Sequence, residues 1–455
     1  MLETDGSGPL WGPATERAVT AFPVSGQRLP RPFLRILALI KQQAAATNAE
    51  LGLLEEPVAA AIGRAAQEVI DGAHWDQFPV DVYQTGSGTS TNMNCNEVLA
   101  ALATGFAGTP VHPNDDVNRC QSSNDVIPTT MQLSAAVAAQ DSLLPALRRL
   151  ADALAEKQQE FWPVLKLART HLQDATPIRL GQEFRGYAGQ VHESIRRIRH
   201  AVEELEAVPL GGTAAGTGIN CHPEFAARTC ARLAERTGLR VRETDNHFYA
   251  QATLDAVITA HGLIRAAALA IWKISSDLRL LATGSRSGFG EIVIPDIGVT
   301  SSIMPGKVPP AVVESATMVV ARIVGNDATI GFAQTGSFLE LNVMMPVVAT
   351  SLLESIELLA ATADNLAVRC VAGLEATEHG PRNVERGTML VTALSPLIGY
   401  DAATGIVRQA REQDRTVREV ALEHGFAAEQ LDALLEPGKL TAAHEQVGNG
   451  SAPAG

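Results

Sequence analysis

The sequence has few cysteines, and they follow no pattern of a known covalent framework. The five residues Cys95, Cys120, Cys221, Cys230 and Cys370 include no C-x-x-C pair. An odd number of cysteines in a chain of 455 residues argues against a disulfide framework and against a zinc knuckle. Reduced thiols are typical of a cytoplasmic protein, and we expect that location.

Positive charge is also scarce. Lysine and arginine number 36 against 50 acidic residues, which gives a formal net charge of −14. This balance argues against nucleic-acid and anionic-membrane partners, although an anionic substrate can still bind where the surface is locally basic. Residues 1–6 are acidic and contain no apolar run, so the sequence predicts no signal peptide.

Aromatic residues make up only 4% of the chain, and alanine and leucine dominate its middle, where helical periodicity is strong. Apolar residues recur at helical spacing over about residues 130–161, 181–207, 249–282, 311–332 and 341–372. Helices of this length far exceed the mean of roughly 11–12 residues. Apolar residues on most faces of several segments predict that other helices enclose them. The sequence therefore predicts a mainly α protein with an elongated bundle, and it favours association of several chains.

The most apolar of these segments, about residues 256–274, is interrupted by His261, Arg265 and Lys273. We interpret it as a buried helix and expect no membrane span. The overall pattern predicts three domains: a mixed, mostly helical one at 1–121, the long-helix bundle at 122–378, and a small helical one at 379–455. The last of these includes a tail, after about residue 445, that we expect to be disordered.

Polar connections between the expected helices carry the candidates for chemistry. Around Ser87 and Thr89, small hydroxyls and glycine-exposed amides suit a carboxylate, although helix capping alone explains the same residues. The segment 121–125 leads into a helix, whose N-terminus favours anions. Asp115 and Asp116 beside His112 suggest a metal site, but no second histidine follows at ligand spacing, so we expect no metal.

Two further connections contain groups suited to proton transfer. His171 lies in a polar connection before a long helix, and imidazole titrates near neutral pH, although a lone histidine is more often structural. The connection 284–307 is flanked by glycines, as lids often are, and contains Ser301 and Lys307. A serine acts as a base only where positive charge or oriented amides lower its pKa. Lys307 provides such a charge, or holds a substrate carboxylate.

Together these segments resemble class II fumarases of the fumarase/aspartase superfamily. Seven runs match in the family's order: 86–97 (GSGTSTNMNCNE), 112–128 (HPNDDVNRCQSSNDVIP), 169–184 (RTHLQDATPIRLGQEF), 210–220 (LGGTAAGTGIN), 301–308 (SSIMPGKV), 340–343 (ELNV) and 398–401 (IGYD). The resemblance implies a mainly α, three-domain fumarase/aspartase-like fold. It also implies a homotetramer whose central domains form a twenty-helix core, with each active site shared by three chains and no metal or organic cofactor.

The resemblance also implies roles for individual residues. Ser301 matches the catalytic base, and His171 matches the second catalytic residue, held by a glutamate that matches Glu314. Contacts to the substrate carboxylates are implied for Ser87, Thr89, Ser122, Ser123, Asn124, Thr170 and Lys307. A secondary dicarboxylate site is implied for His112, Asn114 and Asp115.

The expected reaction is the reversible anti addition of water to fumarate, giving L-malate through an aci-carboxylate intermediate. Three positions depart from the family: Pro309 stands where an asparagine usually binds substrate, Thr300 where glycine precedes the serine, and Ser285 where proline is usual. An aspartase-type ammonia lyase, or a lyase for another substituted succinate, is the first alternative. His171 favours water over ammonia, because aspartases typically carry glutamine there. Retention of Ser301, Lys307, His171 and Glu314 argues against a non-catalytic relative.

Overall fold

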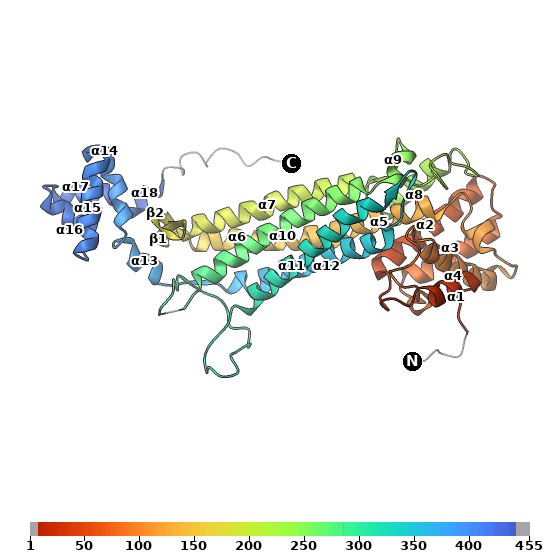
Figure 1. Cartoon of the computed structure of the whole chain (residues 1–455), viewed down its shortest axis with the longest axis horizontal. Coiled ribbons are helices and arrows are strands. Elements are labelled where there is room, and N and C mark those ends of the chain that lie inside the picture. The colour runs from red at the N-terminus through yellow and green to blue at the C-terminus, as the bar shows by residue number, and fades with distance from the viewer. Residues whose placement is uncertain (1–7, 285, 443–455) are drawn as a thin grey trace. The chain divides into compact units, whose positions relative to one another are not determined.

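The computed structural model describes residues 8–284 and 286–442, and these residues are mainly helical, as expected (Figure 1). The acidic N-terminal residues, Ser285 and the tail expected to be disordered lie outside the described residues. The chain forms two compact units. Unit 1 contains residues up to Ala146, Ser194–Leu269 and Met318–Ala361, and unit 2 contains Leu147–Glu193, Ala270–Thr317 and residues from Thr362 onward. The division into three domains stays a prediction.

Unit 1 has a core of helices around α2 (Arg31–Glu50), which packs against α3, α5 and α8. Phe33, Leu37 and Ile40 repeat at helical spacing on α2 and are fully buried. The unit also contains α1 (Pro13–Ala21), α3 (Glu56–Ile70), α4 (Thr89–Ala107), α5 (Ser123–Ala138), α8 (Phe225–Thr237), α9 (His247–Ala252), and the strand pairs β3 (Ala207–Val208) with β4 (Arg242–Glu243) and β6 (Ser337–Phe338) with β7 (Leu341–Asn342).

All five expected long helical segments are present. The first begins at Ser123, earlier than expected, because Ser122 caps it, and it continues through a π-turn at Ala139–Leu143 into α6 (Leu144–Glu160). The others are α7 (Leu180–Glu204), α10 (Asp255–Leu281), α11 (Ala311–Ala333) and α12 (Met345–Arg369). The segment expected from residue 249 breaks at Thr253, whose backbone is extended, so that α9 precedes α10.

Two of these helices, α10 and α12 with the turn that follows it, are long and apolar enough to cross a membrane. In unit 1, however, α10 carries the buried His261, whose ring nitrogens lie 2.9 Å from Asp327 of α11 and 2.9 Å from Ser355 of α12. A buried histidine with both nitrogens paired is typical of helices that pack against one another in a protein core. This network supports the interpretation of α10 as a buried helix.

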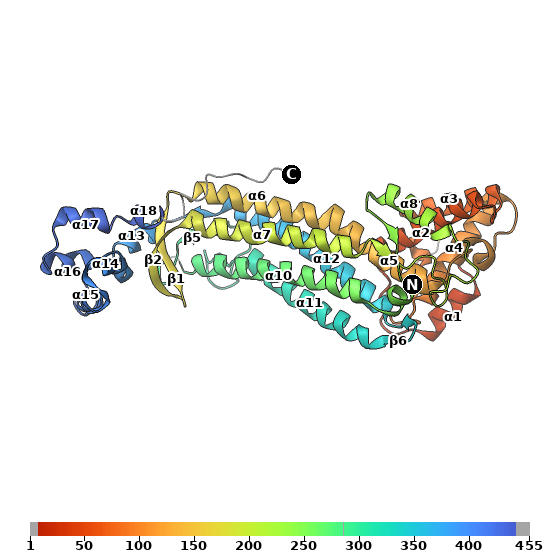
Figure 2. The same cartoon turned by 90° about the horizontal axis from the view of Figure 1, so that it is seen from above.

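Unit 2 contains a β-hairpin that the sequence did not predict (Figure 1 and Figure 2). Strands β1 (Leu165–Thr170) and β2 (Gln173–Arg179) pair antiparallel, so the stretch expected to be a polar connection is a turn and a second strand. Short strands β5 (Ile292–Val293) and β8 (Glu375–Ala376) also pair. After them come α13 (His379–Val384), α14 (Ser395–Ile398), α15 (Tyr400–Glu412), α16 (Val417–Glu423), α17 (Ala428–Leu434) and α18 (Pro437–Leu440), with a separate apolar cluster.

A buried ion-pair network fixes the hairpin within unit 2. Lys166 of β1, with a side chain only 2% exposed, lies 2.6 Å from Glu183 and 2.9 Å from Glu291. The other oxygen of Glu291 accepts a hydrogen bond of 2.8 Å from Arg169, whose guanidinium also stacks over Phe289. Because burial makes an unpaired charge costly, each partner depends on the others.

We predict that Lys166→Met destabilises the protein by roughly 3–5 kcal/mol, because it leaves the Glu183 carboxylate without its cation and the buried Glu291 carboxylate with Arg169 alone. Urea unfolding followed by circular dichroism measures this effect. Arg149→Met removes the solvent-exposed pair with Asp364 and serves as the control, for which we expect little change. A urea midpoint for Lys166→Met equal to that of the wild type would contradict the prediction.

Candidate active site

A cluster of hydroxyls lies at the N-termini of α4 and α5 in unit 1. The Ser87 and Thr89 hydroxyls are 2.8 Å apart, and the Thr89 and Ser123 hydroxyls are 2.7 Å apart. Ser122 is the N-cap of α5, where its hydroxyl accepts a hydrogen bond from the Asn124 amide. The structure therefore brings together five of the seven residues expected to contact substrate carboxylates, at helix ends that favour anions. They are Ser87, Thr89, Ser122, Ser123 and Asn124.

Two glycines make the approach of these loops possible. A Cβ at Gly86 would lie 1.7 Å from the carbonyl oxygen of Val343, so no other residue fits there without moving the backbone. Gly88 begins α4 with a φ of 71°, in the left-handed region. Glycine is therefore required at both positions, at Gly86 by backbone contact and at Gly88 by its left-handed conformation.

Asp125 joins this cluster to a third loop. Its carboxylate is fully buried and accepts hydrogen bonds from the amides of Ser122, at 2.9 Å, and of Gly211 and Thr213, each at 3.0 Å. Burial raises the pKa of the Asp125 carboxyl, and the three amides oppose that rise. The sequence analysis assigned no role to Asp125, although the capping pattern of Ser122 followed three residues later by an acid was a signal for it.

The residues expected to form a secondary site also come together. The Nδ1 atom of His112 accepts hydrogen bonds from the backbone amides of Asn114, at 3.3 Å, and Asp115, at 3.1 Å. A cavity of about 850 Å³ is lined by Asn114, Asp115 and Ser122 together with residues of the loop 213–223. A carboxylate oxygen of Asp115 also lies 3.2 Å from this Nδ1 atom.

In unit 2, His171 lies at the tip of the hairpin. His171 and Leu172 form the two-residue turn, each with a φ of 58°, and the backbone next to them pairs Thr170 with Gln173. Such turns normally use glycine or asparagine, and each non-glycine residue in this region costs of order 1–3 kcal/mol. Thr170 and His171 are both exposed, so the strained turn presents them to solvent.

Ser301 lies in the long segment between α10 and α11, which Figure 1 shows as an excursion away from these two helices. The Ser301 hydroxyl accepts hydrogen bonds from the backbone amides of Met304, at 3.0 Å, and Ile303, at 3.4 Å. The amide of Ser301 in turn donates to the carbonyl of Lys307, at 3.3 Å, and closes the turn. Two amides directed at one hydroxyl oxygen stabilise its deprotonated form.

A cavity of about 640 Å³ in unit 2 adjoins this turn. Lys307, Pro309 and Glu314 line it together with Arg279 and His379. Pro309 offers no backbone N–H and no side-chain donor, whereas its neighbours supply three cations or potential cations. The position where the family usually has asparagine is therefore part of a mainly apolar cavity wall that also carries Arg279, Lys307, Glu314 and His379.

The expected site residues are divided between the two units. Those of the hydroxyl cluster and of the secondary site belong to unit 1, whereas Thr170, His171, Ser301, Lys307 and Glu314 belong to unit 2. Within residues 8–284 and 286–442, no hydrogen bond or ion pair joins His171 to Glu314, and no three His, Cys, Asp or Glu side chains gather as metal ligands do. The roles of these residues, and the absence of a metal, stay predictions.

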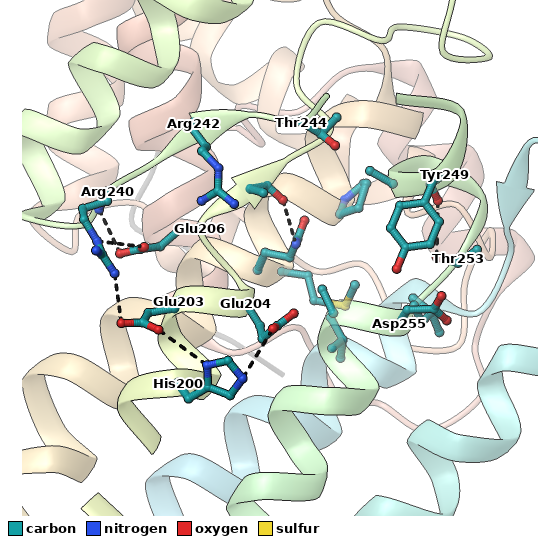
Figure 3. Close-up of a pocket in the computed structure, with 18 residues that line it drawn as sticks. His200, Glu203, Glu204, Glu206, Arg240, Arg242, Thr244, Tyr249, Thr253 and Asp255 are labelled. Atoms are coloured by element: carbon teal, nitrogen blue, oxygen red, sulfur yellow. Dashed lines mark hydrogen bonds and ion pairs between the residues drawn. The ribbon is translucent and has the colours of Figure 1, made fainter. Parts of the chain in front are cut away.

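One more cavity, of about 570 Å³, contains none of the expected catalytic or substrate-binding residues (Figure 3). Its wall carries paired charges: His200 lies between Glu203 and Glu204, at 3.5 and 3.6 Å, and Arg240 lies 3.1 Å from Glu203 and 3.3 Å from Glu206. Since three carboxylates face one arginine and one histidine in these pairs, they leave no excess positive charge for an anion.

Comparison with known proteins gives a consistent result over nearly the whole chain. A family profile described as "Lyase" matches residues 3–325, and one described as "Fumarase C C-terminus" matches residues 390–442. The chain is 45% identical over 450 residues to the class II fumarate hydratase of Methylorubrum extorquens, covering 96% of this chain and 95% of that protein. It is 44% identical over 440 residues to that of Nitrosomonas europaea, covering 95% of each. The crystal structure of class II fumarase from Schistosoma mansoni superimposes with a TM-score of 0.94 at 37% identity, covering 96% of each chain.

Proposed function

The chain belongs to the lyase family that includes the class II fumarases, with their fumarase/aspartase fold, and we propose that it catalyses the reversible addition of water to fumarate, giving malate. The enzyme is then a carbon–oxygen lyase that acts on a small dicarboxylate. The observation that carries the proposal is the Ser301 turn, in which two backbone amides point at one hydroxyl.

In the direction from malate, we propose that Ser301 removes the proton next to a carboxylate. Such a proton is weakly acidic, because its removal adds a second negative charge to the carboxylate group. The Ile303 and Met304 amides and the charge of Lys307 favour the deprotonated serine, which makes it a competent base. Lys307 and the hydroxyl cluster of unit 1 stabilise the aci-carboxylate that forms.

On the opposite face of the substrate, we propose that His171, directly or through a water, protonates the departing hydroxyl. Thr170, next to it in the exposed turn, binds a substrate carboxylate, and Glu314 orients the imidazole. His112, Asn114 and Asp115 form the secondary dicarboxylate site. No metal or organic cofactor takes part in this proposal.

An ammonia lyase, or a lyase acting on another substituted succinate, is the second candidate. The specific observation in its favour is Pro309, which lines the cavity beside Lys307 without offering a hydrogen-bond donor. His171 at the hairpin tip favours water as the added group. A non-catalytic homologue is the least favoured candidate, because the Ser301 turn and the hydroxyl cluster are both present.

We further propose a cytoplasmic homotetramer in which the long helices of four chains form one twenty-helix core. In the single chain, α10 exposes Leu269, Trp272 and Leu280, and α11 exposes Met318 and Phe332, the last two by 68% and 67%. Large apolar side chains exposed in rows are typical of surfaces that another chain covers. Each active site then combines the hydroxyl cluster, the hairpin tip and the Ser301 turn from three chains.

We predict that the purified protein hydrates fumarate, measured as loss of the ultraviolet absorbance of the conjugated double bond. Ser301→Ala lowers kcat by at least about a hundredfold, because the base is removed, and leaves the oligomer intact by light scattering. Ser287→Ala, a serine of the same connection outside the proposed machinery, is the matched control. Inactivity with fumarate alone but turnover when ammonia is added would support the ammonia lyase instead.

We predict that Pro309→Asn lowers KM for fumarate by about tenfold or more, since a hydrogen bond to a charged group contributes roughly 1.5–3 kcal/mol. Steady-state kinetics with fumarate measure it. Pro309→Ala removes the same ring without adding a donor and should leave KM unchanged. Equal effects of both substitutions would assign the change to backbone freedom and not to the missing donor.

We predict that two inactive variants complement each other if chains share active sites. Ser301→Ala and Ser123→Ala are unfolded together, refolded as a mixture and assayed with fumarate. If Ser301 and Ser123 of one site come from different chains, each is intact in about half of the sites of an equal mixture. About a quarter of the sites then contain both serines. Recovery no greater than the sum of the separately refolded variants would place both residues in one chain.

A further inference from the structure

Two of the five cysteines line the cavity that also contains Asn114, Asp115 and Ser122. Cys120 precedes the N-cap of α5 by two residues, and Cys221 follows the glycine-rich loop that binds Asp125. Cys120 is 7% exposed, and Cys221 is half-buried. The cavity, of about 850 Å³, gives small molecules access to this pair.

The two thiols line the same cavity and differ in acidity. Interaction with Cys221, followed by the His222 amide and the charge of Arg119, lowers the pKa of the Cys120 thiol. Interaction with Cys120, together with burial, raises the pKa of the Cys221 thiol, which donates a hydrogen bond of 3.6 Å to the His222 carbonyl oxygen. A thiolate next to a thiol, open to a cavity, is the arrangement of a reactive cysteine pair.

We propose that Cys120 and Cys221 are a dithiol modification site, which low-molecular-weight disulfides convert to an intramolecular disulfide beside the substrate-binding cluster. With a small disulfide, the Cys120 thiolate attacks one sulfur, forms a mixed disulfide and releases one small thiolate. Cys221 then loses its proton to solvent and attacks the Cys120 sulfur, which releases the second small thiolate. Both protein sulfurs are oxidised, and the small disulfide takes up the two electrons.

The other three cysteines differ from this pair in every relevant property. Cys95, Cys230 and Cys370 are at most 2% exposed. Burial raises the pKa of each of these thiols to about 12, so they stay protonated and unreactive near neutral pH. They provide matched controls within the same chain.

The Cys120–Cys221 disulfide would change the geometry of the neighbouring hydroxyl cluster. A disulfide holds its sulfurs at about 2.0 Å, closer than two unlinked thiols, so the segment from Cys120 to Ser122 has to move toward Cys221. Ser122 caps α5, and Ser123 and Asn124 follow it directly. Oxidation therefore displaces groups of the hydroxyl cluster, and we expect a several-fold rise in KM for fumarate. This last expectation rests on the proposed function.

The test treats the full-length protein with glutathione disulfide at neutral pH and maps its peptides without reduction. We expect one linked peptide pair that joins Cys120 to Cys221, with a mass two hydrogen atoms below the sum of the two reduced peptides. Dithiothreitol should remove this linked pair and restore the original KM. Cys120→Ser and Cys221→Ser should abolish the link and the change in KM. Cys230→Ser should behave as the wild type.

Several results would overturn the proposal. They are the absence of a linked pair, a pair that includes another cysteine, or a stable glutathione adduct on Cys120 in the wild-type protein. If the serine variants do not fold, alkylation of the wild type by iodoacetamide decides: Cys120 has to react before the three buried cysteines. The peptide map does not depend on fumarate turnover. A protein that forms the link but does not hydrate fumarate supports the dithiol site and overturns only the proposed function.

Discussion

The buried carboxylate of Asp125 accepts backbone hydrogen bonds from Ser122, Gly211 and Thr213, and the arrangement of the hydroxyl cluster depends on it. A charge without solvent exposure has to be satisfied by its neighbours, so the loop after residue 210 is held against the start of α5. Lys41 lies in the same core and attracts Asp125, although burial lowers the pKa of this lysine to about 8. The anion-favouring end of α5 is therefore fixed before any substrate arrives, which reduces the cost of ordering it.

Glu291 has the corresponding role in unit 2. It contacts Lys166 near the base of the hairpin and Arg169 near its tip, and its own backbone pairs with Leu281 and Thr377. The strained turn at His171 is thus supported from below by a buried ion-pair network, which supplies the stabilisation that such a backbone conformation requires. In both units, one buried acid holds polar groups of the candidate site in position from inside the protein.

Sequence reasoning succeeded where the signal is local and periodic. The long helices follow from apolar spacing, and the residues of the hydroxyl cluster follow from runs of glycine, serine and threonine. The sequence did not predict contacts between residues that are far apart along the chain. Asp125 accepts a hydrogen bond from Gly211, 86 positions away, and Arg169 donates to Glu291, 122 positions away. The hairpin was missed because its turn is His171–Leu172, with none of the glycine or asparagine that normally marks such a turn. The resemblance to a family suggested roles for residues that no spacing rule supplies.

Of the departures from the family, Pro309 lies apart from the contacts of the Ser301 oxygen and of the hydroxyl cluster, whereas Thr300 directly precedes Ser301. The Ser301 oxygen is held by amides of its own turn, and the cluster around Ser87, Thr89 and Ser123 depends on glycines and on Asp125, so neither involves position 309. Pro309 instead belongs to the cavity wall with Lys307 and Glu314. In the proposed mechanism, a substitution there removes one donor from carboxylate recognition and leaves the Ile303 and Met304 amides at Ser301 unchanged. We infer that proton abstraction and recognition of the second carboxylate depend on separable contacts. The class of reaction can persist while the preferred dicarboxylate changes.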